Sequence, residues 1–395
     1  MKKFCYLFLF ITIVSLSYAQ RQSITWQGLQ REYIIRIPSS WDGQRQLPVV
    51  YILHGVGGEV ETYDSTLNIT SFSDMSGWIT VLPQALNCNM SVMGQQLNLG
   101  TLWNAGLSAN IFNQTFSPNS NIDDEGFLLA LLDSMETIYP IDRDSIFMVG
   151  SSMGGFMTNY MGIKHSDIFA GISPICGTIP NNSVNTQPTN HLNVLYFHGT
   201  NDQVVNYADG STNNIPHVGT VSLGLGAEQT VDYWKEANNC NSEAIIDSLE
   251  DRREDGLRFV NFQYKNVDDG TKVNFIKILN GEHAWYVNSD IHDIDFLVEI
   301  YKFFSGNNIQ YPNSGIKDIE NTDFAIYPNP AINHVNISVR KDCSIQITNS
   351  LGQKIKNIHI NYGNTILDIS YLKPGFYFLS LQDKNQRIVK KLIVK

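Results

Sequence analysis

The stretch that decides the fold is Ile146-Phe147-Met148-Val149-Gly150-Ser151-Ser152-Met153-Gly154-Gly155. An apolar run typical of a buried strand precedes Gly150, and a segment with helical composition follows over 156–163. The glycines flanking the serines indicate a crowded turn, because a side chain at 150 or 154 would collide with the neighbouring strand or helix. The sequence therefore predicts a strand, a sharp turn and a helix, with Ser152 rather than Ser151 exposed at the turn.

Around this stretch, from Arg31 to about Phe304, short β-branched runs alternate with longer segments of helical period. This alternation is typical of a mostly parallel sheet flanked by helices. We expect strands over 33–37, 49–53, 79–82, 145–149, 193–197 and 273–279, and amphipathic helices over 127–139 and 294–304. The sequence thus predicts an α/β domain over 24–304.

The composition changes after this domain. Residues 305–323 are rich in Ser, Gly, Asn and acidic side chains, as in a linker. Beyond them the helical period disappears, and alternating runs are separated by turns that contain Gly or Pro. These runs, at 334–339, 344–348, 366–369, 376–381 and 388–394, predict a small all-β sandwich over 324–395.

The first nineteen residues have the pattern of an export signal. Two lysines precede an apolar run over 4–16, and the small-x-small triplet Ser17-Tyr18-Ala19 allows cleavage before Gln20. A short core helix is the alternative. No later segment approaches the roughly 18 uninterrupted apolar residues of a membrane span. We therefore expect an exported chain whose mature form has no membrane span.

Net charge and cysteine content argue against several classes of partner and site. The formal net charge of −11 becomes −13 without the two lysines of the leader, and no basic cluster opposes it, which excludes nucleic acid as a partner. The four remaining cysteines match neither a zinc site nor a dense disulfide framework. Cys88 and Cys240 are one possible pair, and isolated buried thiols are the alternative for Cys88, Cys176, Cys240 and Cys343.

A serine nucleophile needs a base, and the base needs an acid that fixes its tautomer. The chain order that goes with a Gly-x-Ser-x-Gly turn is Ser, then Asp or Glu, then His. Asp202 follows the strand-like run 193–197, and His283 follows the run 273–279. Both lie where the carboxyl ends of strands build the sites of open α/β sheets. We therefore predict the catalytic triad Ser152, Asp202 and His283.

Two other side chains compete for these roles. His198 lies four residues before Asp202 and is the rival base, although its place at a strand end suits a structural hydrogen bond. Glu282 is the rival acid, but it would have to point back at the histidine next to it.

Acyl transfer also needs hydrogen-bond donors for the oxyanion, usually the amide after the nucleophile and one from a loop after an early strand. The run 49–53 ends in His54-Gly55-Val56-Gly57-Gly58. This pattern predicts the backbone N–H groups of Val56 and Met153 as the oxyanion hole, with Gly57 as the alternative to Val56. A plain glycine-rich turn is the competing interpretation. The sequence has no His-Glu-x-x-His, phosphate-binding loop or dinucleotide fingerprint, so we predict no metal and no cofactor.

A set of short phrases resembles a known family. They are Leu53-His-Gly55, Leu82-Pro-Gln84, Leu102-Trp-Asn104, Asp123-Asp-Glu-Gly-Phe127, Gly150 to Gly155, His198-Gly-Thr-Asn-Asp202 and His283-Ala-Trp285. Together they resemble the secreted α/β-hydrolase esterases grouped with polyhydroxybutyrate depolymerases and with family 1 carbohydrate esterases, the feruloyl and acetylxylan esterases. The valine after His-Gly and the serine at 151 are places where this chain departs from, or varies within, the family pattern.

The resemblance implies a serine esterase that works through an acyl-enzyme. Feruloyl or acetyl esters of plant polysaccharide are the expected substrates, because an exported enzyme suits a polymer too large to import; polyhydroxyalkanoate is the alternative. Trp103 and Trp285 are expected to line the acyl pocket, since an indole offers a flat apolar wall, or else to belong to the core. A serine peptidase or a catalytically silent binding module on the same fold are the other classes, although a peptidase usually carries an extra propeller or cap.

The C-terminal sandwich has phrases of its own. Ile326-Tyr-Pro-Asn-Pro330, Asn349-Ser-Leu-Gly-Gln353, Leu372-Lys-Pro-Gly-Phe-Tyr-Phe378 and the final Lys390-Lys-Leu-Ile-Val-Lys395 closely resemble the C-terminal sorting domain of the type IX secretion system. The resemblance implies export across the outer membrane to the cell surface or medium, with the secretion machinery as a partner. A carbohydrate-binding or adhesion sandwich is the rival.

Overall fold

The computed structural model describes residues 21–394 except 93–94, 112–113, 213–219, 250, 288–291, 308–323, 328–330, 340–341, 350–353, 374 and 383–386. The chain divides into two compact units, Met1–Ile309 and Gln310–Lys395. The expected signal peptide and most of the expected linker lie outside the described residues.

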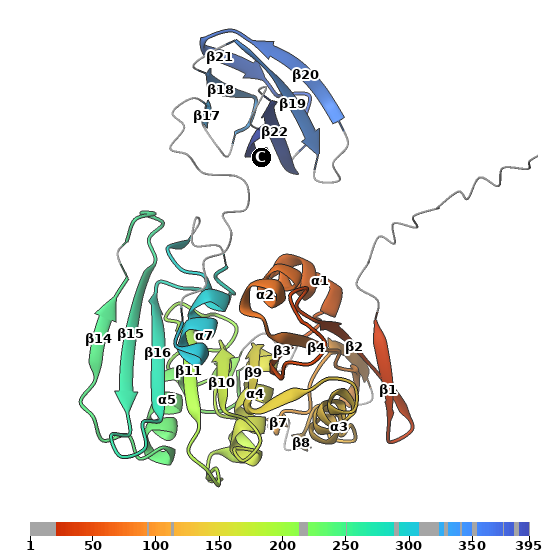
Figure 1. Ribbon diagram of the computed structural model, residues 1–395, viewed down its shortest axis with the longest axis vertical. Coiled ribbons are helices and arrows are strands. Elements are labelled where there is room, and N and C mark those ends of the chain that lie inside the picture. Colours follow the sequence, from red (N-terminus) through yellow and green to blue (C-terminus); the bar gives the residue numbers. More distant parts are fainter. Residues whose placement is uncertain are drawn as a thin grey trace, which may run out of the picture. The chain divides into compact units, whose positions relative to one another are not determined.

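A ten-stranded sheet forms the centre of the larger unit (Figure 1). Its six central strands are parallel, and two antiparallel strands extend it at each edge. In spatial order the strands are β1 (Gln22–Trp26), β2 (Leu29–Arg36), β4 (Ile79–Pro83), β3 (Leu47–Leu53), β9 (Ile141–Ser151), β10 (Gly171–Ile175), β11 (Asn193–Gly199), β16 (Lys272–Leu279), β15 (Arg258–Lys265) and β14 (Ile245–Ser248).

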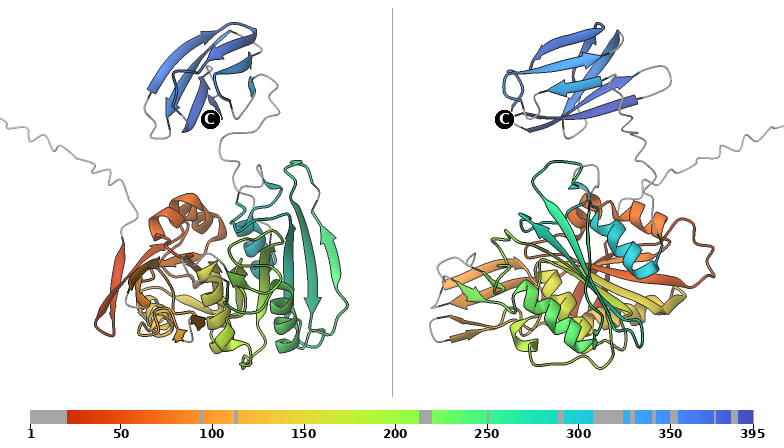
Figure 2. Two further views of the ribbon diagram at one scale, coloured as in Figure 1. Left: turned by 180° about the vertical axis from the view of Figure 1, so that it is seen from behind. Right: turned by 90° about the vertical axis from the view of Figure 1, so that its left-hand side faces the viewer.

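Helices cover both faces of this sheet (Figure 2). One face carries α3 (Asp124–Glu136), α4 (Met153–Lys164) and α5 (Ala227–Ala237), and the other carries α2 (Ile69–Ser76) and α7 (Phe296–Ser305). The short helix α1 (Val60–Thr66) follows β3, and the 3-10 helix η1 spans Asn181–Ser183. Three small hairpins complete the unit: β5 (Asn87–Val92) with β6 (Gln95–Thr101), β7 (Ala109–Ile111) with β8 (Gln114–Phe116), and β12 (Ser211–Thr212) with β13 (Val221–Ser222).

Period-two patterning of the central strands explains why both faces are covered. Along β3, Tyr51 and Leu53 belong to the core cluster shared with α3 and α4, whereas the intervening Ile52 is equally buried but lies outside that cluster. On the other face, Phe147 of β9 stacks on Phe304 of α7 with ring centroids 4.4 Å apart. Strands that are apolar on both sides are expected in a parallel sheet that is buried on both faces.

The expected α/β architecture is confirmed, and every strand expected in this unit is present with its limits moved by a few residues. The sequence did not predict β10 or the β14–β15 hairpin, nor helices α1, α2 and α5. The last two strands extend the sheet beyond β16 by antiparallel pairing.

The smaller unit is a sandwich of two antiparallel sheets, as the sequence predicts. One sheet has the order β17 (Phe324–Tyr327), β18 (His334–Val339), β21 (Gly363–Asp368), and the other β20 (Lys354–Ile360), β19 (Cys343–Asn349), β22 (Gly375–Gln382), β23 (Arg387–Val394). Both sheets contribute side chains to one apolar core, among them Ile337, Ile347 and Leu379.

The structure describes the state of three cysteines and the character of the helices. Cys88, Cys176 and Cys240 are free thiols, so the possible Cys88–Cys240 bridge is not formed and the isolated-thiol alternative holds for these residues. Of the helices in the described part of the chain, none combines the length and hydrophobicity that crossing a bilayer requires.

Candidate active site

Ser152 lies at the junction of β9 and α4, as the sequence predicts. Its backbone has φ 56° and ψ −120°, a conformation that is strained for a residue with a side chain. Ser152 is half-buried, whereas Ser151 is buried. The turn therefore presents the hydroxyl of Ser152, not that of Ser151, at the carboxyl end of the sheet.

The flanking glycines are required by backbone contacts. A Cβ atom at Gly150 would lie 2.3 Å from the carbonyl oxygen of Gly154, on α4. A Cβ atom at Gly154 would lie 2.3 Å from the carbonyl oxygen of Leu53, on β3. Main-chain atoms cannot move aside as a flexible side chain can, so the expected collisions with helix and strand are confirmed.

Asp202 and His283 come from two loops that are tied together at the ends of neighbouring strands. The amide of Asn201 donates to the carbonyl of Gly281 over 2.9 Å, and that of Thr200 donates to the carbonyl of Ile278 over 2.9 Å. Since β11 and β16 are parallel neighbours, both loops emerge at the same edge of the sheet. The two side chains meet there, with Nδ1 of His283 2.7 Å from Oδ2 of Asp202.

The Asp202 carboxylate is buried and well supplied with donors. Its Oδ1 accepts from the amides of Val204 and Val205 over 2.8 and 2.9 Å. Burial alone would raise the pKa of Asp202, but the hydrogen bonds and charge interactions with His198 and His283 outweigh it and hold the pKa well below its ordinary value. An ionised Asp202 keeps the proton of His283 on Nδ1, which leaves Nε2 free to act as a base.

Cys176 lies beside this pair, one residue after the strand end that holds the serine turn. It follows Ile175, whose carbonyl accepts the amide of Ser152 over 2.8 Å. The sulfur of Cys176, a carboxylate oxygen of Asp202 and a ring nitrogen of His283 all lie within 4.8 Å of one another. Within the described residues the Ser152 hydroxyl forms no hydrogen bond; such catalytic contacts are often long in a free enzyme and shorten when substrate binds.

This cluster suits proton transfer better than metal binding. The Asp202 oxygens are already used by backbone and histidine donors, and burial raises the pKa of the Cys176 thiol well above its ordinary value. A metal needs a deprotonated thiolate and free lone pairs. The donor set therefore fits a hydrogen-bonded relay.

The rival residues have other roles. His198 is fully buried, with Nδ1 2.6 Å from the hydroxyl of Tyr196 and Nε2 3.0 Å from the carbonyl of Val205. Both ring nitrogens are thus engaged in buried contacts, and Nε2 also lies 3.4 Å from Oδ2 of Asp202. Glu282 is exposed, and the carboxylate that is hydrogen-bonded to His283 is that of Asp202.

The glycine-rich turn after β3, residues 54–58, which we call the oxyanion turn, lies against Ser152. A Cβ atom at Gly55 would be only 3.1 Å from Cβ of Ser152. The amides of Gly55, Gly57 and Gly58 donate to Tyr63, Thr101 and Gly55. The amide of Val56 has no acceptor in the described part of the chain, whereas Gly57, the alternative donor, is already engaged.

The two tryptophans, expected to line the acyl pocket or to belong to the core, lie in different surroundings. Trp103 is buried in the core, and its Nε1 donates to the carbonyl of His54 over 2.9 Å. It therefore supports the oxyanion turn through this hydrogen bond, and its burial fits the core alternative that the sequence left open. Trp285 is half-buried, 6.3 Å from the ring of Phe296, and its Nε1 has no partner among the described residues. Its pocket role stays a prediction.

Sequence reasoning missed three side chains around the oxyanion turn. The hydroxyl of Tyr63 accepts from the amide of Gly55 over 3.0 Å and lies 2.8 Å from Oγ of Ser151. Gln84 and the ring of His54 are hydrogen-bonded to each other over 3.0 Å. His54 and Gln84 stand in phrases that carried the family resemblance, which was the available signal; Tyr63 had none.

Family comparisons agree with this geometry. Residues 41–217 match the phospholipase/carboxylesterase family, and these residues include the oxyanion turn, Ser152 and Asp202. The larger unit has the α/β-hydrolase fold, and residues 41–217 of it resemble this family. Residues 325–395 match the secretion system C-terminal sorting domain, so the expected resemblances of both units are confirmed. We refer to the units below as the hydrolase unit and the sorting domain.

Individual relatives are distant. Feruloyl esterase B of Piromyces equi is 24% identical over 64% of this chain and 42% of its own length. Poly(3-hydroxyalkanoate) depolymerase C of Paucimonas lemoignei is 26% identical over 33% of this chain and 28% of its own length. A solved acetyl xylan esterase from Aspergillus awamori is 14% identical with a TM-score of 0.47, covering 72% of this chain and 99% of that one. The chain thus spans less than half the length of these two curated relatives.

Proposed function

We propose that the protein is an exported serine carboxylic-ester hydrolase that acts through an acyl-enzyme. The proposal assigns Ser152 as nucleophile, His283 as general base and acid, and Asp202 as the acid that orients His283. The contact that carries it is the 2.7 Å hydrogen bond between Asp202 and His283, formed beside a strained serine turn.

The proposed reaction has two steps, acylation of Ser152 and hydrolysis of the acyl-enzyme, and His283 transfers protons in both. Nε2 of His283 takes the proton of Ser152 as Oγ attacks the ester carbonyl, and ionised Asp202 stabilises the imidazolium. The amides of Val56 and Met153 donate to the oxyanion. The intermediate collapses when His283 protonates the leaving alcohol, and a water activated by the same imidazole then releases the acid from Ser152.

The first test is hydrolysis of p-nitrophenyl acetate by the wild type and two serine variants. We expect Ser152→Ala to lower kcat by at least about 10⁴-fold, since the nucleophile is lost. Ser151→Ala is the matched control, and we expect it to retain activity within about tenfold because Ser151 is buried and only hydrogen-bonded to Tyr63. Unchanged turnover by Ser152→Ala would remove this residue from the mechanism; absence of turnover in the wild type would favour a binding module.

For the substrate, we propose feruloyl or acetyl esters of plant polysaccharide, in line with the feruloyl esterase among the relatives. Polyhydroxyalkanoate is the alternative, in line with the depolymerase. Purified enzyme offered methyl ferulate, acetylated xylan and a polyhydroxybutyrate film distinguishes them by the product released. Cleavage of a peptide substrate with none of these esters turned over would instead indicate a peptidase.

The sorting domain indicates export. We propose the finer route, in which a leader over 1–19 directs the chain to the periplasm and the type IX machinery carries it across the outer membrane. Deleting residues 324–395 should then leave the hydrolase unit in the periplasm, whereas its appearance in the medium at the wild-type level would contradict the route.

A further inference from the structure

The ring of His54 is fixed in one tautomer by its surroundings. Its Nε2 receives the amide of Ala85, which can only donate, over 3.0 Å. Nε2 is therefore the acceptor nitrogen, and the ring proton is on Nδ1. That Nδ1 lies 2.7 Å from the carbonyl oxygen of Gly55, so His54 donates to it.

The carbonyl of Gly55 belongs to the same peptide unit as the amide of Val56. A trans peptide is planar, with its C=O and N–H groups pointing in opposite directions. His54 and the amide of Gly58, which donates over 3.1 Å, anchor the oxygen side of this unit. The N–H of Val56 is therefore directed away from the His54 ring, and no group in the described part of the chain accepts it.

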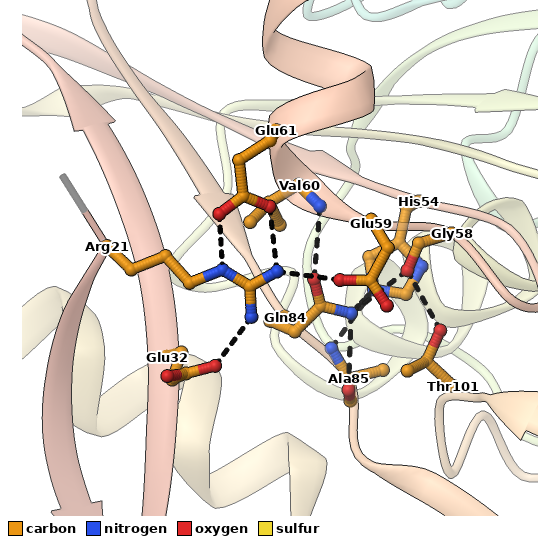
Figure 3. A network of polar contacts seen from close by, with 10 residues as sticks. All are labelled: Arg21, Glu32, His54, Gly58, Glu59, Val60, Glu61, Gln84, Ala85 and Thr101. Atoms are coloured by element: carbon orange, nitrogen blue, oxygen red, sulfur yellow. Dashed lines mark hydrogen bonds and ion pairs between the residues drawn. The ribbon is translucent and has the colours of Figure 1, made fainter. Parts of the chain in front are cut away.

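Gln84 completes the support (Figure 3). Its Nε2 lies 3.0 Å from both Nε2 of His54 and the carbonyl of Gly58, and its Oε1 accepts the amide of Val60 over 3.0 Å. The side chain thus joins the start and the end of the oxyanion turn to the first residue of α1. Gly58 is needed for this packing, because a Cβ atom there would lie 2.7 to 2.9 Å from the His54 side chain.

We propose that His54, held by Gln84, is a positioning residue that orients the Gly55–Val56 peptide so that its N–H group meets the oxyanion. The inference rests on the proposed esterase function and deepens it. His54 acts only through the Gly55–Val56 peptide and has no direct role toward the substrate or Ser152.

A matched pair of variants tests this role. His54→Asn keeps an N–H group close to the position of Nδ1, whereas His54→Leu has a similar shape and no donor. With p-nitrophenyl acetate we expect His54→Leu to lower kcat about 100-fold with KM within about threefold, the signature of a weakened oxyanion hole. His54→Asn should retain kcat within about tenfold of the wild type. Equal losses in the two variants, or an unchanged kcat in His54→Leu, would overturn the proposal.

Two further measurements make the result decisive. If His54→Leu does not fold, Gly58→Ala replaces it, with the same loss of kcat expected from displacement of the His54 ring. Gly43→Asn is its control, because that position lies outside the oxyanion turn and has open space and a left-handed φ of 82° that asparagine tolerates. An unchanged kcat in a folded Gly58→Ala protein rejects the proposal. An inactive Ser152→Ala beside a fully active His54→Leu rejects only the positioning role, whereas an active Ser152→Ala rejects the esterase mechanism itself.

Discussion

Two glycine-containing turns meet at the proposed active site, and different contacts shape them. In the serine turn, side chains at Gly150 and Gly154 would strike main-chain oxygens. In the oxyanion turn, a side chain at Gly58 would strike the ring of His54, and one at Gly57 would meet nothing within 4 Å. The first turn is determined by its own backbone and the strand beside it. The second is determined by the ring of its own His54 and by side chains that approach from other parts of the hydrolase unit.

The two turns should therefore respond to substitutions at different positions. Main-chain collisions allow only glycine at positions 150 and 154. The local sequence therefore predicts the conformation of the serine turn almost completely. The oxyanion turn depends on Tyr63, Gln84 and Trp103, which approach it from later parts of the chain. Substitutions at those positions can alter catalysis without altering the glycines themselves.

The largest expected effect is a glycine substitution in the serine turn. We expect Gly154→Ala to cost more than about 4 kcal/mol or to prevent folding, because its Cβ would overlap the carbonyl of Leu53 on a buried strand. Gly57→Ala in the oxyanion turn should cost only about 1 kcal/mol, through its left-handed φ. Urea unfolding of both variants measures the contrast, and equal stabilities would show that the two turns are not shaped differently.

The next effect is a pH dependence that the oxyanion turn contributes through His54, whereas the serine turn over 150–154 contains no titratable side chain. Burial lowers the pKa of His54 to about 4 from an ordinary 6.5. Below pH 6.5 the unfolded chain binds a proton that the folded chain rejects, so stability falls as the pH falls, by about 3 kcal/mol at pH 4. Unfolding at pH 7, 5.5 and 4.5 should show this slope in the wild type and a shallower one in His54→Asn; parallel slopes would exclude His54 as the source.

A smaller effect is expected beneath the oxyanion turn. Trp103→Phe removes the donor to the carbonyl of His54 and leaves a small cavity. We expect a loss of about 2 kcal/mol in unfolding free energy. Trp41→Phe, whose indole donates to a carbonyl at an exposed position, is the control and should cost less. A loss in Trp103→Phe no greater than in the control would mean that this support is not important for stability.

The smallest effect concerns the helix that follows the oxyanion turn. Arg21, the residue before β1, bonds to Glu32, Glu59 and Glu61 at 2.5 to 2.6 Å and ties the start of β1 to β2 and α1 (Figure 3). The cluster is partly exposed, so Arg21→Gln should cost only about 1 kcal/mol, and less in high salt. Adding Glu61→Gln should restore part of the loss by removing repulsion among the carboxylates. A double variant less stable than Arg21→Gln would contradict this account.

Much of this architecture could be predicted because its signals are local. Short apolar runs that end in glycine or polar residues predict the serine turn and the strands leading to Asp202 and His283. Strand β10 escaped prediction because Pro174 interrupts a short run, and proline is uncommon in a central strand. Strand β14 escaped because its residues, including Ile245 and Ile246, are exposed at the edge of the sheet and show no alternation of burial.

Side-chain roles were harder to predict than positions. The sequence left Trp103 open between the acyl pocket and the core, because burial depends on which residues pack over an indole. It identified His54 as part of a turn but could not assign the ring proton, which depends on the amide of Ala85 from another strand end. Such roles follow from contacts between segments distant in sequence, which no local pattern records.

The unbridged cysteines of the hydrolase unit have a practical consequence. Cys88 and Cys176 are buried and Cys240 is half-buried, each as a free thiol. A reductant therefore has no bond to break among these three cysteines. We expect the hydrolase unit to keep its fold and turnover in millimolar dithiothreitol, whereas an enzyme held by disulfides would lose its cross-links.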